Sequence, residues 1–462
     1  MNVLCLFQKF DLNSSTIYLD LVNELSDRGH NVYILALTSD REKAGKTENT
    51  GNIRVAYEFI PDQFHTNKIK KGLIQLLIGR TIYKGVRKNF FNEKVDIMIY
   101  PTPPVTLSGI LRPLKQHYGA VNYLMLKDIF PQNAVDLHMM KEGGLLHRLF
   151  RKMERELYRD SDIIGCMSGG NLEYIKTHEP EVDPSKLEIF PNTVKVIEVE
   201  TDRGDPHPSA LRAATLPSTD ALSASKRASK CSTGAFCPRG GKADEPEIQE
   251  DFPVRFIFGG NLGKPQAVDF LMGGIAELKD EVNAEFIFIG SGTEEDRIRN
   301  FIRDRNVGNL KLYKELPRRE YEKVLKDADI GIVSLSPYFT IPNYPSRILS
   351  YMQISKPVLA VTDRVTDIKG LVTEEARCGW WCPSDDRKAF MDTVKKIVSE
   401  RELFKEYGKN GREYLKENFN VERSAEILEG HCPHPSTSST PVSSPDSVVA
   451  ERLTDARCAK RI

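Results

Sequence analysis

The chain has 462 residues and a hydrophobic fraction of 40%, which supports two or three folded domains and excludes disorder throughout. Its 65 basic and 65 acidic side chains cancel, so no overall positive field recruits nucleic acid. The eight cysteines are scattered, a pattern typical of reduced thiols in the cytoplasm, and Cys378 and Cys382 lack a second pair that would complete a metal site. We therefore expect a cytoplasmic protein with no metal. No apolar stretch approaches the roughly 20 residues of a membrane-spanning helix.

A strand, a helix and a second strand open the chain. Residues 3–7 form an apolar run, residues 17–25 place apolar side chains at helical spacing before Gly29, and residues 31–37 form the next apolar run. This order predicts a right-handed βαβ unit and a parallel sheet. Further buried strands are expected at 95–100, 121–126, 163–167 and 186–190. We assign residues 1–200 to an N-terminal Rossmann-like domain.

The same alternation restarts at residue 254 and predicts a second Rossmann-like domain over residues 252–430. Its expected strands are 254–258, 284–289, 310–313, 330–334 and 357–361, with a helix over 267–278. The fold class is therefore α/β, with two doubly wound domains that face a cleft.

Two segments interrupt this pattern. Residues 201–251 are rich in Pro, Ser, Ala, Gly, Lys and Arg, and residues 431–462 have a similar bias. Such composition predicts a disordered linker or insertion and a disordered tail. The abrupt change from the flanking sequence also allows a translated frameshift.

The clearest chemical motif is a glycine-rich turn, Phe258-Gly259-Gly260-Asn261-Leu262-Gly263-Lys264-Pro265-Gln266, placed between a strand and a helix. Glycines let the backbone approach an anion, and a helix N-terminus offers free N–H donors, so a diphosphate fits. A plain tight turn is the alternative. The spacing matches neither the dinucleotide fingerprint nor the Walker motif.

Two more loops lead from a strand into a helix. Ile289-Gly290-Ser291-Gly292 is one, and structure alone explains it as well as ligand binding does. The other runs from Tyr338 through Pro345-Ser346-Arg347 to Met352. Its hydroxyl, cation and free N–H groups could converge on phosphate oxygens, although a Pro-started surface helix has the same sequence.

These motifs, in this order, resemble the C-terminal half of family-four glycosyltransferases. In the N-terminal half, Asp128-Ile129-Phe130-Pro131-Gln132, Glu154-Arg155-Glu156-Leu157-Tyr158, Met167-Ser168 and Pro191-Asn192 are similar to the surface-polysaccharide members of that family. The resemblance implies the GT-B fold, an acceptor-binding first domain, and a second domain that binds a nucleotide-sugar, with UDP as the expected nucleotide. It also implies transfer without cofactor or obligatory metal, retention of the anomeric configuration, and a glycan or lipid-linked acceptor.

The resemblance assigns residues by motif. Lys264 and Arg347 would offset the charge of the leaving group, and a further set would line the donor. The implied donor-binding residues are Gly259, Gly260, Asn261, Gly263, Gln266, Gly290, Gly292, Leu316, Pro317, Pro345 and Ser346.

Asp128 follows an expected strand and should face the cleft from the N-terminal sheet. By family position it would orient or deprotonate the acceptor hydroxyl as a catalytic residue, and Lys127 would bind an acceptor phosphate. A helix N-cap explains Asp128 equally well.

Residues 68–88 mix cations with aliphatic side chains at helical spacing. Such a helix suits peripheral contact with an anionic membrane on its inner face, and equally suits packing on the domain sheet with a solvated basic face.

Two alternative functions remain. Many family members carry a pair of glutamates around the third loop, where this chain has Pro342 and Ser350. A catalytically silent nucleotide-sugar-binding protein of the same fold is therefore one alternative, and a nucleotide-sugar epimerase is the other.

Overall fold

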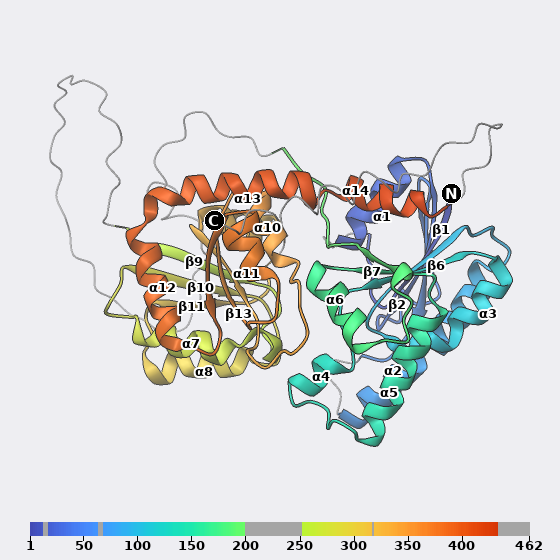
Figure 1. Cartoon of the computed structure of the whole chain (residues 1–462), viewed down its shortest axis with the longest axis horizontal. Coiled ribbons are helices and arrows are strands. Elements are labelled where there is room, and N and C mark those ends of the chain that lie inside the picture. The colour runs from blue at the N-terminus through green and yellow to red at the C-terminus, as the bar shows by residue number, and fades with distance from the viewer. Residues whose placement is uncertain (13–16, 63–67, 199–251, 317, 433–462) are drawn as a thin grey trace, which may run out of the picture.

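The computed structural model describes residues 1–12, 17–62, 68–198, 252–316 and 318–432, without the side chains of residues 68–71, 73, 318 and 319. Within these residues two helix-covered sheets lie side by side (Figure 1), which confirms the predicted α/β fold class. The predicted disordered segments 201–251 and 431–462 lie outside the described residues, apart from His431 and Cys432.

The first sheet has eight strands in the order β3-β4-β2-β1-β5-β6-β7-β8. They are β1 (Asn2–Phe7), β2 (Asn31–Thr38), β3 (Thr47–Thr50), β4 (Ile53–Phe59), β5 (Ile97–Pro101), β6 (Val121–Leu126), β7 (Ile163–Cys166) and β8 (Leu187–Ile189). All neighbours are parallel except β3 and β4. The sequence pattern does not predict these two strands, because β3 is polar and β4 interrupts its apolar positions with Arg54 and Glu58.

Helices cover both faces of this sheet. They are α1 (Ile17–Asp27), α2 (Lys68–Asn89), α3 (Ser108–Tyr118), α4 (Gln132–Asp136), α5 (Leu145–Asp160) and α6 (Gly169–His178), with short 3₁₀ turns η1 (Val105–Leu107) and η2 (Pro184–Lys186). Apolar side chains of α2, α3 and α5 form one buried core with the sheet. The first strand β1 is buried on both faces, as expected for a parallel sheet between helical layers.

The second sheet has six parallel strands in the order β11-β10-β9-β12-β13-β14. They are β9 (Val254–Gly259), β10 (Ala284–Ile289), β11 (Leu310–Tyr313), β12 (Ile330–Ser334), β13 (Val358–Thr362) and β14 (Gly379–Pro383). The strand order reverses between β9 and β12. In open α/β sheets, ligands bind beyond the carboxyl ends of the strands at such a reversal.

The helices of the second half are α7 (Val268–Glu277), α8 (Glu295–Arg305), α9 (Arg318–Asp327), α10 (Arg347–Gln353), α11 (Ile368–Gly370), α12 (Arg387–Ser399), α13 (Phe404–Asn418) and α14 (Val421–Gly430). Short turns η3 (Lys264–Gln266), η4 (Leu371–Glu375) and η5 (Arg401–Leu403) complete the elements. Apart from β14, the strands of this half fall where the sequence predicts them, within one residue at each end.

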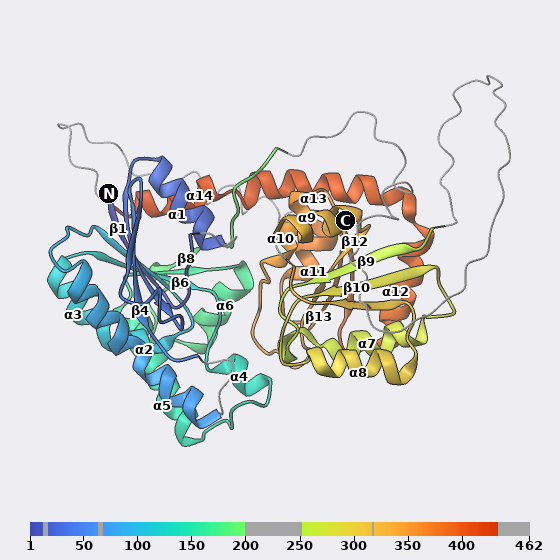
Figure 2. The ribbon, with the colours of Figure 1, turned by 180° about the vertical axis from the view of Figure 1, so that it is seen from behind.

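The last helix, α14, returns to the first sheet, as the ribbon shows from the front and from behind (Figures 1 and 2). Val421, Ala425 and Leu428 lie in the hydrophobic core that β1, β2 and α1 form. His30 and Arg28 contact the Glu429 carboxylate at 2.7 and 3.1 Å. The sequence analysis assigned residues up to 430 to the second domain, whereas these last ten residues pack on the first.

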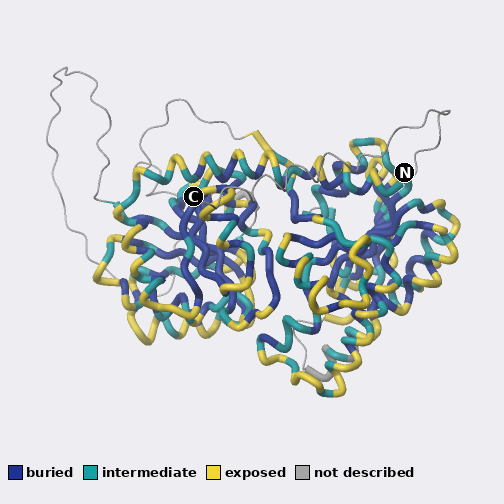
Figure 3. Tube along the Cα trace, viewed as in Figure 1, coloured by how far each residue is buried: buried dark blue, intermediate teal, exposed yellow. Residues whose placement is uncertain are grey.

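The burial pattern follows the layers of each half (Figure 3): most strands are buried along their length, β3, β8 and β11 excepted, and helices alternate between buried and exposed residues. None of the described helices is long and apolar enough to cross a membrane.

Candidate functional site

The carboxyl ends of the two sheets face each other. The backbone N–H of Gly170, just after β7, donates to the Asp367 carboxylate, which follows β13, at 2.7 Å. The Asn192 amide, after β8, donates to the Tyr344 carbonyl oxygen, after β12, at 3.1 Å. Side chains that follow strands in either half therefore point toward the interface between the halves.

The glycine-rich turn lies at the reversal of the second sheet. Strand β9 ends at Gly259, and Gly260 has a φ of +112°, which side-chain-bearing residues rarely adopt. The Gln266 side-chain oxygen accepts the Gly263 N–H at 3.2 Å and the Asn261 amide at 3.3 Å. Gln266, which we assigned to the donor, therefore closes the turn from inside.

The second glycine turn supports the first. Gly290 has a φ of +153°, and a Cβ there would overlap the Gly260 carbonyl. A Cβ on Gly292 would likewise overlap the backbone of Leu262. Leu262 N–H donates to the Ser291 carbonyl at 2.9 Å. The geometry thus explains Gly290 and Gly292 as the close packing of two turns, the structural alternative that the sequence left open.

Arg347 lies against the glycine-rich turn from across the reversal. Its guanidinium stacks over the Phe258 ring at 4.3 Å, and a Cβ built on Gly260 would lie 3.6 Å from Nη2. Nη1 is buried without a hydrogen-bond partner, and Arg347 has no carboxylate partner among the described residues. Burial lowers the pKa of Arg347, although a guanidinium stays charged at physiological pH. A partly buried cation without an anion is a candidate anion-binding group.

Two tyrosines that the sequence analysis did not single out complete this corner. The Tyr321 hydroxyl occupies the space that a side chain at Gly259 would need. The Tyr351 hydroxyl accepts the Gly259 N–H at 3.4 Å and lies 3.1 Å from the Ile332 carbonyl, to which it donates. Glycine at 259 is therefore required by its neighbour Tyr321, a signal that the sequence does not carry.

The remaining candidates for donor binding have these positions. Lys264 is exposed and has no ion-pair partner among the described residues. Pro345 is half-buried, and Ser346 is exposed and makes no side-chain cap to α10, which spans seven residues. Leu316 packs at the margin of the core below the site. Pro317 lies outside the described residues.

Asp128 and Lys127 lie at the end of β6 in the first sheet. Their backbone N–H groups donate to the Thr102 hydroxyl at 3.4 and 3.1 Å. Burial raises the pKa of Asp128 to about 7 and lowers the pKa of Lys127 to about 7. The Lys127 ammonium lies 5.3 Å from the centre of the Phe190 ring. Helix α4 begins four residues after Asp128, with Pro131 at its N-cap, so the N-cap alternative for Asp128 is excluded.

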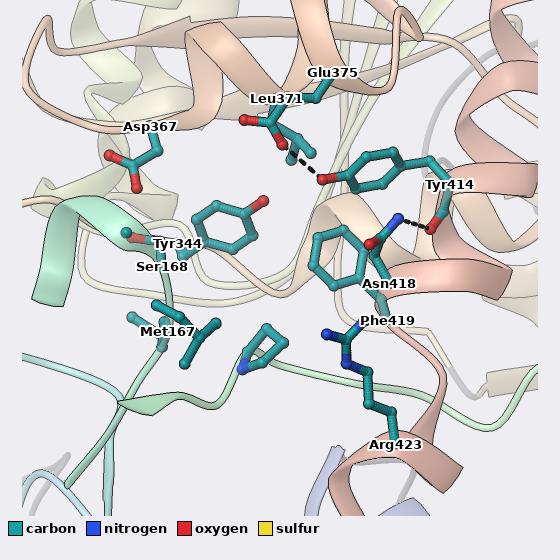
Figure 4. Close-up of a pocket in the computed structure, with 13 residues that line it drawn as sticks. Met167, Ser168, Tyr344, Asp367, Leu371, Glu375, Tyr414, Asn418, Phe419 and Arg423 are labelled. Carbon is teal, nitrogen blue, oxygen red and sulfur yellow. Dashed lines mark hydrogen bonds between the residues drawn. The ribbon is translucent and has the colours of Figure 1, made fainter. Parts of the chain in front are cut away.

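A separate hollow of about 190 Å³ lies between the halves, close to the α13–α14 connection (Figure 4). Tyr344, Tyr414 and Phe419 line it, and Tyr414 donates to Glu375 at 2.6 Å. None of the predicted donor or acceptor residues lines it. It is therefore distinct from the glycine-rich corner.

Residues 243–414 match the model of the family described as "Glycosyl transferases group 1". Over these residues the chain is similar to group 1 glycosyltransferases. This match spans the glycine-rich turn, Arg347 and the supporting tyrosines. It confirms the predicted glycosyltransferase and its family resemblance at this level.

Other relatives agree with this assignment. The chain is 24% identical to a "Probable glycosyltransferase WbjE" of Pseudomonas aeruginosa over 339 residues. The matched region covers 71% of this chain and 72% of that protein. Solved structures show the GT-B fold. HepE of Anabaena in complex with UDP has a TM-score of 0.59 at 13% identity, over 93% of this chain and 99% of that one. WaaG, "a glycosyltransferase involved in lipopolysaccharide biosynthesis", has a TM-score of 0.58 at 13% identity, over 93% and 100%.

Proposed function

We propose that the transferase takes its sugar from a nucleoside-diphosphate sugar, with UDP as the nucleotide. The observation that carries this proposal is the Arg347 guanidinium beside Gly260 at the reversal of the second sheet, whose Nη1 is buried without a hydrogen-bond partner. A diphosphate there would supply the missing anion, and planar guanidinium is suited to bidentate phosphate binding. The solved HepE structure, which holds UDP, is similar in fold and supports the choice of nucleotide.

Departure of the nucleoside diphosphate places negative charge on its β-phosphate. In the proposed reaction Arg347 and Lys264 offset that charge, so that no obligatory metal is needed. The exposed Lys264 can swing toward the phosphate, whereas Arg347 is fixed by its stacking on Phe258. Transfer with retention of the anomeric configuration is the outcome that the family resemblance implies.

The acceptor hydroxyl belongs, in this proposal, to a glycan or a lipid-linked oligosaccharide of a cell-surface polysaccharide. Asp128 is the proposed base. Its pKa near 7 would let the carboxylate take a proton at physiological pH, and its place after β6 faces the second half. Lys127 would pair with an acceptor phosphate. The similarity in fold to WaaG, which acts in lipopolysaccharide biosynthesis, supports this acceptor class.

Peripheral contact with the membrane is part of the same proposal. Ile74, Ile78, Ile82 and Val86 of α2 are buried against the sheet, so one face of this helix packs as the alternative interpretation expected. The opposite face exposes Leu76 and Leu77 beside Arg80 and Lys84. The side chains of residues 68–71 and 73 lie outside the described residues.

A second exposed apolar group lies near the start of α5. Leu145 is 87% exposed and Met139 is 61% exposed, with Leu146 and Leu149 close in sequence and Arg148 and Lys152 among them. In parallel α/β units the helices begin near the carboxyl ends of the strands, so α2 and α5 both start at the edge that bears Asp128. Apolar and basic side chains together suit the inner face of an anionic membrane.

A thermal-shift screen with UDP, GDP, CDP, ADP and NAD tests the donor, because a ligand that binds only the folded state raises the Tm. We expect UDP to raise the Tm of the wild type and to leave Arg347→Ala unchanged. Donor turnover then identifies the reaction: a transferase slowly releases UDP, an epimerase interconverts sugars, and a silent binder does neither. Stabilisation by none of the five ligands would contradict the proposal.

Vesicle co-sedimentation tests the membrane contact. The wild type should bind vesicles that contain phosphatidylglycerol and not pure phosphatidylcholine vesicles. The double variant Leu145→Ser and Leu149→Ser should lose most of this binding. Val365→Ser, which changes an exposed valine of the second half, is the matched control and should bind as the wild type does. Equal binding by both variants would exclude the contact.

A further inference from the structure

The segment between β12 and α10, residues 335–346, is held by the opposite half of the molecule. Leu335, Phe339 and Ile341 follow a strand of the second sheet, yet their side chains are at most 5% exposed and lie in the hydrophobic core of the first. The Tyr338 ring lies 5.3 Å from the ring of His138, just beyond α4. We call this segment the bridging loop.

Polar contacts hold the bridging loop to the first half as well. The Asp136 carboxylate accepts the Thr340 N–H at 2.8 Å and the Thr340 hydroxyl at 3.0 Å. The Asn171 amide donates to the Pro342 carbonyl at 2.7 Å, and the Asn192 amide donates to the Tyr344 carbonyl at 3.1 Å. Three side chains from three parts of the first half thus contact the loop at alternate residues.

Asp136 is the charged member of this set. It is 7% exposed, lies at the end of α4, and also accepts the Gln132 amide at 2.8 Å. Among the described residues no cation pairs with it. A buried carboxylate is stable only when hydrogen bonds replace its hydration, and Thr340 supplies two of the three donors. Asp136 and this conformation of the loop therefore stabilise each other.

The other side of the bridging loop contacts the donor corner. The Ser336 N–H donates to the Pro265 carbonyl at 2.8 Å, beside the glycine-rich turn. The loop ends at Ser346, so its conformation sets the position of Arg347 and of the start of α10. One continuous segment thus joins the first half, the glycine-rich turn and the proposed phosphate-binding cation.

We propose that Asp136, through Thr340, is a positioning residue that holds the bridging loop so that Arg347 meets the donor diphosphate. Donor affinity then depends on contact between the two halves. This inference rests on the proposed function, because the measured quantity is the affinity for UDP, which we assign to Arg347. A merely structural Asp136 would change the Tm without changing the affinity of the folded protein for UDP.

Substitutions at the pair separate these roles. Asp136→Asn removes the negative charge, so the charge-assisted bonds to Thr340 become weaker neutral ones even if the Gln132 amide flips to accept from the new amide nitrogen. Thr340→Val removes the hydroxyl and keeps the backbone N–H, whereas Thr340→Ser keeps both. Ser424→Ala is the matched control: it removes a buried hydroxyl on α14 that lies 2.8 Å from the Thr193 hydroxyl, away from the bridging loop.

UDP titration calorimetry on the full chain is the first measurement. Because Asp136→Asn weakens the hydrogen bonds that hold the bridging loop, we expect it to weaken UDP binding about tenfold. Thr340→Val should weaken it less, Thr340→Ser and Ser424→Ala should bind as the wild type does, and Asp136→Asn with Thr340→Val should differ little from Asp136→Asn alone. Wild-type affinity in a folded Asp136→Asn variant would overturn the proposal.

Hydrogen exchange of the backbone amides of residues 338–341, 343 and 344, without nucleotide, is the second measurement. Faster exchange in Asp136→Asn than in Ser424→Ala is expected, and equal exchange would overturn the hold on the loop. This readout needs no donor. If the wild type bound no nucleoside diphosphate, the proposed function would fail, while exchange would still decide whether Asp136 holds the loop.

Discussion

Arg347 and Asp128 are the two charged residues on which the proposed reaction depends most. Each is partly buried, and among the described residues neither has an ion-pair partner. Structural charges that are withdrawn from water are usually paired, because desolvation costs free energy. Uncompensated charges of opposite sign on the two sides of one interface fit an anionic donor on one side and a proton acceptor on the other.

At Arg347, charge and shape can be separated by substitution. Arg347→Ala should weaken UDP binding about a hundredfold and Arg347→Lys about tenfold, since lysine keeps the charge but loses stacking on Phe258 and bidentate geometry. Calorimetry at constant ionic strength measures both affinities. Equal affinity in the lysine variant and the wild type would mean that charge alone acts here, and full affinity in the alanine variant would remove Arg347 from the donor site.

Asp128 gives a pH-dependent prediction for catalysis. Its pKa near 7 means that the proposed base forms as the pH rises through 7, so kcat/KM should rise over that range. Asp128→Asn should lower kcat at least a hundredfold, within the usual range for general bases, and keep UDP affinity within about twofold. Initial rates from pH 5.5 to 8.5 test this. A variant with unchanged transfer would remove Asp128 from the mechanism.

The same carboxyl group affects stability with a definite sign. Its pKa in the folded chain lies above the ordinary 3.8, so the folded state binds the proton more tightly and its stability falls as the pH rises from about 4 to about 7. Asp128→Asn should remove this loss. The Tm difference between variant and wild type should therefore be larger at pH 8 than at pH 5, and a difference independent of pH would contradict the buried carboxyl.

At the scale of elements, the glycine-rich corner depends on two strand-to-helix turns packed against each other. Both turns are similar glycine motifs in the sequence, but their glycines have different roles in the structure. Gly260 faces Arg347, whereas Gly290 and Gly292 let the second turn approach the backbone of the first. The second turn therefore acts on the site through packing.

Gly290→Ala tests this division. A Cβ would overlap the Gly260 carbonyl at a φ that alanine rarely adopts, so we expect a loss of about 2–4 kcal/mol of stability and weaker UDP binding. Gly308→Ala is the matched control because a Cβ there meets nothing within 4 Å. Differential scanning calorimetry compares the two. Comparable Tm values for both variants would show that the turns can separate without cost.

At the scale of the whole molecule, the chain crosses between its halves more than once. It enters the second half before β9. Between β12 and α10 the bridging loop packs into the core of the first half, and the chain then continues in the second sheet. Helix α14 finally packs on the first half again (Figure 1). The halves are therefore joined by packed cores as well as by the connections between them.

The stability of the first half should accordingly depend on the end of the chain. Leu428→Ala removes a fully buried side chain of α14 from the core shared with β1 and α1, at a cost of about 2–5 kcal/mol. Hydrogen exchange should locate the loss in β1, β2 and α1. Leu415→Ala, buried in the core of the second half, should instead loosen β12 and α10. The same exchange pattern in both variants would contradict this division.

Local patterns in the sequence determined most of the fold. Apolar runs and helical spacing placed the strands from β5 to β13, and glycines after a strand marked the glycine-rich turn, because these depend on backbone conformation and on burial of adjacent residues. The family-like order of motifs also selected Arg347, Asp128 and Lys127. Their depth and protonation could not be predicted, since burial depends on residues that arrive from elsewhere in the chain.

The tertiary structure alone decided how remote segments meet. Asp136 and Thr340 are 204 residues apart, Tyr321 fills the space beside Gly259, and α14 completes the core of the half that it does not follow in sequence. No local sequence pattern predicts such contacts, because secondary-structure propensity depends on neighbouring residues and not on the distant residue that a side chain contacts. The sequence by itself determined most of the elements, though not β3, β4 or β14. Packing between distant segments decided which side chains lie together, because the free energy of burial depends on three-dimensional neighbours and not on sequence distance.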